Sequence, residues 1–116
     1  MKVAILGASA KPGRYSNQAQ KLLMKHGHAV FPVSPLGDEI RGVAGLTKVP
    51  DGMDTVTLYV GEERLLPILD QIIAAGPRRV IFNPGTESSW AMARLTEAGI
   101  ESEEACTLVL LNTGSF

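Results

Sequence analysis

Cysteine is nearly absent from the 116-residue chain, and its scarcity excludes two common ways of stabilising a small protein. The one cysteine, Cys106, cannot form an internal disulfide or assemble a cysteine-rich zinc site. The chain must therefore rely on an apolar core. Its length and its 45% apolar residues are sufficient for one compact domain, which we expect to span residues 1–116.

Long apolar runs are also missing. No stretch approaches the ~20 apolar residues of a membrane span, and the apolar start Val3–Leu6 meets Gly7 too soon for a signal peptide. Aromatic residues make up only 5% of the chain, which leaves few side chains to stack on bases. The sequence predicts a cytoplasmic protein that contacts neither membrane nor nucleic acid.

Acidic residues are absent from the first 37 positions, although the whole chain has a net charge of −1. Residues 1–37 carry a charge of +5, whereas residues 38–116 carry a charge of −6. This separation favours an anionic ligand near the N-terminal third of the chain.

Apolar runs alternate with segments of helical spacing along the chain. Five segments predict strands: Lys2–Leu6, Ala29–Val33, Thr55–Val60, Arg79–Phe82 and the short Ile100–Glu103, of which the first and third are expected to be buried. Helices are predicted between them, from about Ser16 to Gly27, from near Pro67 to Gly76, and from the cap Ser88 to Gly99. Ser34–Gly37 ends the second strand, and residues 38–53 lack periodicity and predict a long connection. Ala105–Leu111 is too short to assign to a helix or a strand.

This alternation predicts an α/β domain, doubly wound, with a mainly parallel five-stranded sheet and helices on both faces. With the strands numbered along the chain, we predict the order 3-2-1-4-5. Strands 1 and 4 would then flank the point where the connections reverse direction, and ligands bind at the carboxyl ends of the strands there. The loops after Leu6 and Phe82 would face each other across this crevice.

The loop after the first strand, Gly7–Gly13, has the features of a phosphate-binding turn. Glycine lets backbone amides approach a diphosphate, and the following helix directs its positive end to the same place. The alternative interpretation is a tight turn that needs glycine only for its backbone conformation. Nearby donors and cations favour the phosphate site: Ser9, Lys11, Arg14, Ser16 and Asn17.

No acidic residue follows the second strand, where a site for NAD requires one to bind the ribose hydroxyls. The sequence there is Pro32-Val33-Ser34-Pro35, and the first acidic residue is Asp38. The expected ligand therefore carries an additional phosphate at its adenosine end, as NADP and coenzyme A do. Ser34 and Arg41 are candidates to contact that phosphate, and Arg41 is equally well explained as an exposed loop charge.

Candidate catalysts are scarce. His26 and His28 lie at the amino-terminal edge of the predicted sheet, opposite the crevice. Cys106 has no histidine near it to activate the thiol, so a buried thiol is favoured over a nucleophile. The remaining polar residues expected at the crevice are Asn83, Thr86, Glu87, Glu103 and Glu104. The crevice thus offers binding groups without an evident acid, base or nucleophile pair.

Several segments together resemble the small stand-alone coenzyme A-binding domain proteins of bacteria. The matching segments are Val3–Ser9, Lys11-Pro12 with Arg14 and Ser16, Pro32–Pro35, Asn83–Glu87 and Glu104–Val109. The same domain forms part of the succinyl-CoA synthetase α subunit and of ADP-forming acyl-CoA synthetases. Those synthetases act through a phosphohistidine and further domains, which this sequence lacks, so ligase activity is not expected.

The resemblance implies a Rossmann-like fold that binds coenzyme A through its diphosphate. On matching positions, the diphosphate would contact the first loop, at Gly7, Ala8, Ser9, Lys11, Arg14 and Ser16, and we include Pro12 and Asn17 in this site. The adenosine end would contact Val33, Ser34 and Pro35. The path toward the thiol arm would be lined by Asn83, Pro84 and Gly85. Cys106 matches a position where the family often has cysteine, which makes a mixed disulfide with coenzyme A an additional hypothesis.

Three functions follow from the sequence. The first is a non-catalytic module that binds coenzyme A or an acyl-CoA through the glycine and serine loop. The second is an NADP-dependent oxidoreductase or redox-sensing protein that uses the same loop. The third is an interaction protein with a vestigial nucleotide site that recruits an enzyme partner. The apolar segment Leu108–Leu111 is either core or the face of a homodimer.

Overall fold

Parallel strands form the centre of the computed structural model, which describes residues 1–116. The strands are β1 (Lys2–Leu6), β2 (Ala29–Val33), β3 (Thr55–Leu58), β4 (Arg79–Phe82) and β5 (Glu101–Glu104). All four strand pairings are parallel, and the order is β2-β1-β3-β4-β5. Val3, Ala4 and Ile5 are each fully buried, as expected for a parallel sheet covered on both faces. The predicted α/β class and five-stranded parallel sheet are confirmed.

The predicted strand order, 3-2-1-4-5, is wrong. β3 pairs with β1, so β2 is an edge strand. The reason lies in the connection after β2. The Leu46 amide donates to the Pro32 carbonyl and the Ser34 amide donates to the Leu46 carbonyl, on the side of β2 facing away from β1. Because this irregular segment occupies the outer edge of β2, β3 joins the sheet beside β1.

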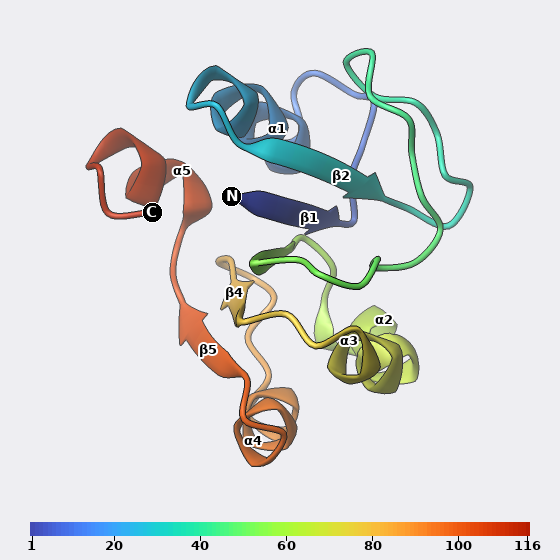
Figure 1. The fold of residues 1–116 in the computed structure, drawn as a ribbon, viewed down its shortest axis with the longest axis vertical. Coiled ribbons are helices and arrows are strands. Elements are labelled where there is room, and N and C mark those ends of the chain that lie inside the picture. Colours follow the sequence, from blue (N-terminus) through green and yellow to red (C-terminus); the bar gives the residue numbers. More distant parts are fainter.

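Helices cover the sheet on both faces (Figure 1). They are α1 (Tyr15–Lys25), α2 (Glu62–Leu65), the 3₁₀ turn η1 (Leu66–Ile68), α3 (Leu69–Ala75), α4 (Ser89–Glu97) and α5 (Thr107–Asn112). Leu23 of α1 and Leu111 of α5 pack with Val3 and Ile5 on one face. The larger cluster on the other face includes side chains of α2, α3 and α4. Leu111 therefore belongs to the core of this chain.

Local signals explain most element boundaries. Pro67 lies in η1, and the helix after β3 is divided there into α2, η1 and α3, as expected from the missing N–H of proline. The Ser88 hydroxyl accepts a hydrogen bond from the Ala91 amide at 3.2 Å, which confirms the predicted cap of α4. Residues 34–54 contain no helix, also as predicted. None of the helices combines the length and the apolar character that crossing a membrane requires.

Candidate functional site

A cleft of about 790 Å³ lies at the carboxyl ends of the strands, beside the point between β1 and β3 where the connections reverse direction. Its walls come from the loops that follow β1, β2, β3 and β4. The lining residues are Leu6, Gly7, Ala8, Ser9, Lys11, Arg14, Tyr15, Ser16, Val33, Ser34, Pro35, Thr47, Tyr59, Val60, Gly61, Arg64, Ile68, Pro84, Gly85 and Thr86.

Eleven of the fourteen residues that the sequence suggested for the site line this cleft. They are Gly7, Ala8, Ser9, Lys11, Arg14, Ser16, Val33, Ser34, Pro35, Pro84 and Gly85. Pro12, Asn17 and Asn83 do not line it. The loops after Leu6 and Phe82 do share one cleft, but β3 lies between their strands.

The loop after β3 was missing from the sequence-based site because the predicted order placed that strand elsewhere. It contributes Tyr59, Val60, Gly61 and, from α2, Arg64. The position of Pro32 in the second strand is a sequence feature that could have predicted this part of the cleft. A proline inside a strand indicates an edge strand, which places β2 at the edge and leaves the inner side of β1 for β3.

Gly7 allows the loop after β1 to pack closely against the loop after β3. Its φ is +91°, and a Cβ atom there would lie 2.8 Å from the Tyr59 carbonyl oxygen. The amides of Gly7 and Ala8 both donate to the Val33 carbonyl, at 3.0 and 3.1 Å. These two amides are therefore occupied, and an anion at this loop must be bound by other donors.

The start of α1 offers such donors. The amides of Tyr15 and Ser16 have no backbone acceptor, no side chain caps the helix, and its first turn contains no acidic residue. Three cations line the same cleft, and none of them takes part in an ion pair: Lys11, Arg14 and Arg64. Free amides, the positive end of the helix and unpaired cations together suit an anion such as a phosphate.

The two asparagines proposed for the site have contacts within the protein. The Asn83 amide nitrogen donates to Thr57 Oγ1 at 2.7 Å and to the Leu58 carbonyl at 2.8 Å, and its Oδ1 accepts from the Thr107 amide at 2.9 Å. Asn17 is 2% exposed and donates to the Ser9 carbonyl at 2.8 Å. Both side chains hold backbone segments that surround the cleft.

The cleft lining contains no histidine, cysteine, aspartate or glutamate. Of the other polar residues expected there, only Thr86 lines it. Glu87 accepts hydrogen bonds from the Gly85 amide, and Cys106 is the residue before α5. Burial raises the pKa of Tyr59, which lines the cleft, to about 12. A phenol with this pKa remains protonated at neutral pH and can donate a hydrogen bond.

The fold and the cleft define a doubly wound α/β domain with an anion-suited cleft at its switch point. Residues 1–112 match the model of the family described as the CoA binding domain, and the chain belongs to this family.

Relatives of known structure share the fold over most of their length. A crystal structure of an uncharacterized protein is 41% identical, with a TM-score of 0.94, and the match covers 99% of this chain and 97% of that one. A conserved hypothetical protein from Pyrococcus furiosus is 32% identical, with a TM-score of 0.84 and coverage of 93% and 97%. The uncharacterized protein YneT of Bacillus subtilis (strain 168) is 25% identical over 84% of this chain and 75% of its own length.

Proposed function

We propose that this protein is a non-catalytic module that binds coenzyme A or an acyl-CoA in the cleft, with the diphosphate at the start of α1. The observation that carries the proposal is the uncapped α1 N-terminus beside three unpaired cations, in a chain of the CoA-binding domain family. The donors for the diphosphate are the free amides of Tyr15 and Ser16 and the side chains of Ser9, Lys11 and Arg14.

The shape of the cleft supports an extended ligand. Its walls come from β2, β1, β3 and β4, which lie side by side, so three strand spacings separate the outermost walls. At ~4.8 Å per spacing this distance is about 14 Å. In the proposed pose the adenosine lies against Val33, Ser34 and Pro35, and the thiol arm extends over the loop after β3 toward Pro84 and Gly85. The volume of about 790 Å³ also falls within the range of small-molecule sites, ~300–1,000 Å³.

The chemistry of the lining supports binding without catalysis. Acyl transfer and hydrolysis need a nucleophile or a general base near the thioester. The residues available in the cleft are hydroxyl groups, cations and apolar side chains. They can orient a coenzyme A derivative and exclude water from part of it.

Isothermal titration calorimetry tests the proposal with coenzyme A, its form lacking the 3′-phosphate, and NADPH. We expect saturable binding of coenzyme A, weaker binding of the form without the 3′-phosphate, and no saturable binding of NADPH. Arg14→Ala should weaken coenzyme A binding by at least about tenfold, because a charge-assisted contact to a phosphate contributes ~1.5–3 kcal/mol.

Lys25→Ala is the matched control, since it removes the same charge from the exposed far end of α1. Its dissociation constant should equal that of the wild type. Absence of coenzyme A binding would refute the proposal. Tighter binding of NADPH than of coenzyme A would instead favour the oxidoreductase or redox-sensor alternative.

A further inference from the structure

Arg41 has a backbone conformation that no other non-glycine residue of this chain adopts. Its φ is +51°, and it is the only non-glycine residue with a positive φ. The left-handed region is unfavourable for a long side chain, and such a conformation persists only where surrounding contacts hold it. The contacts of Arg41 therefore hold its backbone in the left-handed region.

One contact connects Arg41 to the first turn of α1. Arg41 Nε donates to Asn17 Oδ1 at 2.9 Å, and Asn17 Nδ2 donates in turn to the Ser9 carbonyl at 2.8 Å. Asn17 is 2% exposed, so both bonds form at a nearly buried side chain. Arg41, Asn17 and Ser9 thus form a chain of two hydrogen bonds that ends in the loop after β1.

A second contact fixes the position of Arg41 itself. Gln20, which is fully buried in α1, donates from Nε2 to the Ile40 carbonyl at 2.9 Å. Ile40 is 2% exposed and exchanges backbone hydrogen bonds with Val43 across the turn that contains Arg41. The turn at 40–43 is therefore attached to α1 at two places, one turn of helix apart.

We infer that Arg41 is a positioning residue for the ligand loop. Through Asn17 it holds the Ser9 carbonyl, and with it the peptide group that Ser9 shares with Ala10, in one orientation before ligand arrives. The inference rests on the proposed function, since Ser9 belongs to the proposed diphosphate site. Arg41 does not line the cleft, so its effect on affinity passes through Asn17 and not through direct contact.

Pre-organisation predicts a specific consequence for affinity. A loop that samples several conformations binds with an apparent affinity reduced by the fraction of time it spends in the competent one. Removing the Arg41 side chain should therefore weaken coenzyme A binding about fivefold to tenfold, which corresponds to a loop that adopts the competent conformation for about 10–20% of the time.

Two substitutions with different backbone effects test this inference. Arg41→Gly relieves the positive φ, and Arg41→Asn tolerates it, while neither side chain reaches Asn17. Both variants should weaken coenzyme A binding by a similar factor in calorimetry. The factor should persist at high salt, because screening reduces a through-space charge effect but not a positional one. In a double-mutant cycle, Arg41→Gly should add little once Asn17→Ala is present.

Hydrogen–deuterium exchange without ligand provides a readout that does not depend on coenzyme A. The amides of Lys11 and Arg14, which donate to Ser9 Oγ and to the Lys11 carbonyl, should exchange faster in both Arg41 variants than in the wild type and in the control Lys25→Ala. Unchanged exchange and unchanged affinity in the Arg41 variants would overturn the inference while leaving the proposed function intact. If the wild type itself does not bind coenzyme A, the proposed function fails, and the exchange data still decide whether Arg41 orders the loop.

Discussion

At the scale of single residues, the loop after β1 depends on Gly7 for packing. This loop approaches the loop after β3 so closely that a Cβ atom at Gly7 would lie within 3 Å of Tyr59 and of Val60 Cγ1. Gly13 lies six residues later in the same loop. A Cβ atom at Gly13 would have no heavy atom within 4 Å, and its φ is not in the left-handed region. Two glycines of one loop therefore have different roles, although the sequence presents them alike.

Gly7→Ala is expected to destabilise the protein by about 3 kcal/mol, because it combines a clash with backbone strain. Urea denaturation followed by circular dichroism measures this change in the free energy of unfolding. Gly13→Ala is the matched control and should change it by less than about 1 kcal/mol. Similar losses in the two variants would contradict the packing role of Gly7.

At the scale of elements, one buried side chain joins three of them. Asn83, at the end of β4, contacts Thr57 and Leu58 of β3 and the backbone of Thr107, where α5 begins. The hydroxyl groups of Thr57 and Thr107 lie 2.8 Å apart and complete this network. Periodicity could not assign a conformation to the segment before and within α5. The position of this segment depends on the Asn83 network and on the burial of Leu111 against the sheet, and both are contacts with residues distant in the chain.

Asn83→Ala should lower the free energy of unfolding by about 2–4 kcal/mol, since it leaves the buried Thr107 amide without its acceptor and removes the donor to the Thr57 hydroxyl. The affinity for coenzyme A should change by less than about threefold, because Asn83 does not line the cleft. Thermal denaturation and calorimetry measure the two quantities. A large loss of affinity in a variant of normal stability would restore Asn83 to the ligand site.

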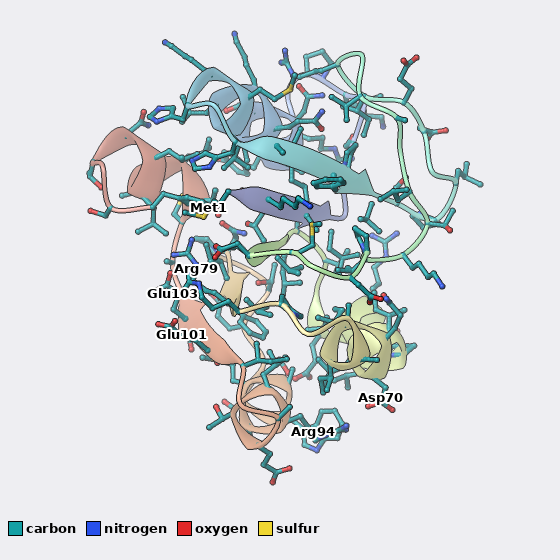
Figure 2. The ribbon with its side chains drawn as sticks, viewed as in Figure 1. Met1, Asp70, Arg79, Arg94, Glu101 and Glu103 are labelled. Atoms are coloured by element: carbon teal, nitrogen blue, oxygen red, sulfur yellow. The ribbon has the colours of Figure 1, made fainter.

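At the scale of the whole molecule, a cluster at the amino-terminal edge of the sheet connects segments far apart in the chain. Figure 2 shows Arg79 and Glu103 side by side near Met1. The guanidinium group of Arg79 also lies 4.6 Å from the centre of the Phe116 ring, and that ring packs against His28 at 5.2 Å. The cluster lies at the opposite edge from the cleft, which confirms the predicted position of His28.

This cluster predicts a pH dependence of stability. Burial, and then the Met1 ammonium group, lower the pKa of His28 below its ordinary value of 6.5. The unfolded chain therefore binds a proton more readily than the folded one, and stability falls as the pH drops below 6.5 toward the folded pKa.

Urea denaturation at about pH 7.5 and about pH 5.5 measures the change. The wild type should lose stability over this interval, and His28→Asn should lose less. Lys25→Ala is the control, because this exposed cation does not contribute to the lowered pKa of His28 and its removal should leave the loss unchanged. An equal loss in His28→Asn would assign the pH dependence to other groups.

The sequence alone determined the elements of the fold and much of the lining of the cleft. Strands β1 to β4 coincide with apolar runs, whereas β5 is polar and partly exposed. Ser88 and Gly99 mark the two ends of α4, and Pro67 marks the division between α2 and α3, because these signals act within a few residues. The β1 loop and the Val33–Pro35 segment reach the cleft for a similar reason. Loops that follow parallel strands always meet at the carboxyl edge of the sheet, whatever the strand order.

Only the tertiary structure decided three features. They are the strand order, the part of the cleft lined by the loop after β3, and the hydrogen bonds from the Gly7 and Ala8 amides. Strand order depends on where residues 34–54 run, and that segment contacts the edge of β2 through Leu46. The amides of Gly7 and Ala8 face the Val33 carbonyl because β1 and β2 are neighbours in register. Each of these features joins residues distant in the chain. Local patterns of polarity and turn chemistry do not encode such contacts, so packing in three dimensions selects them.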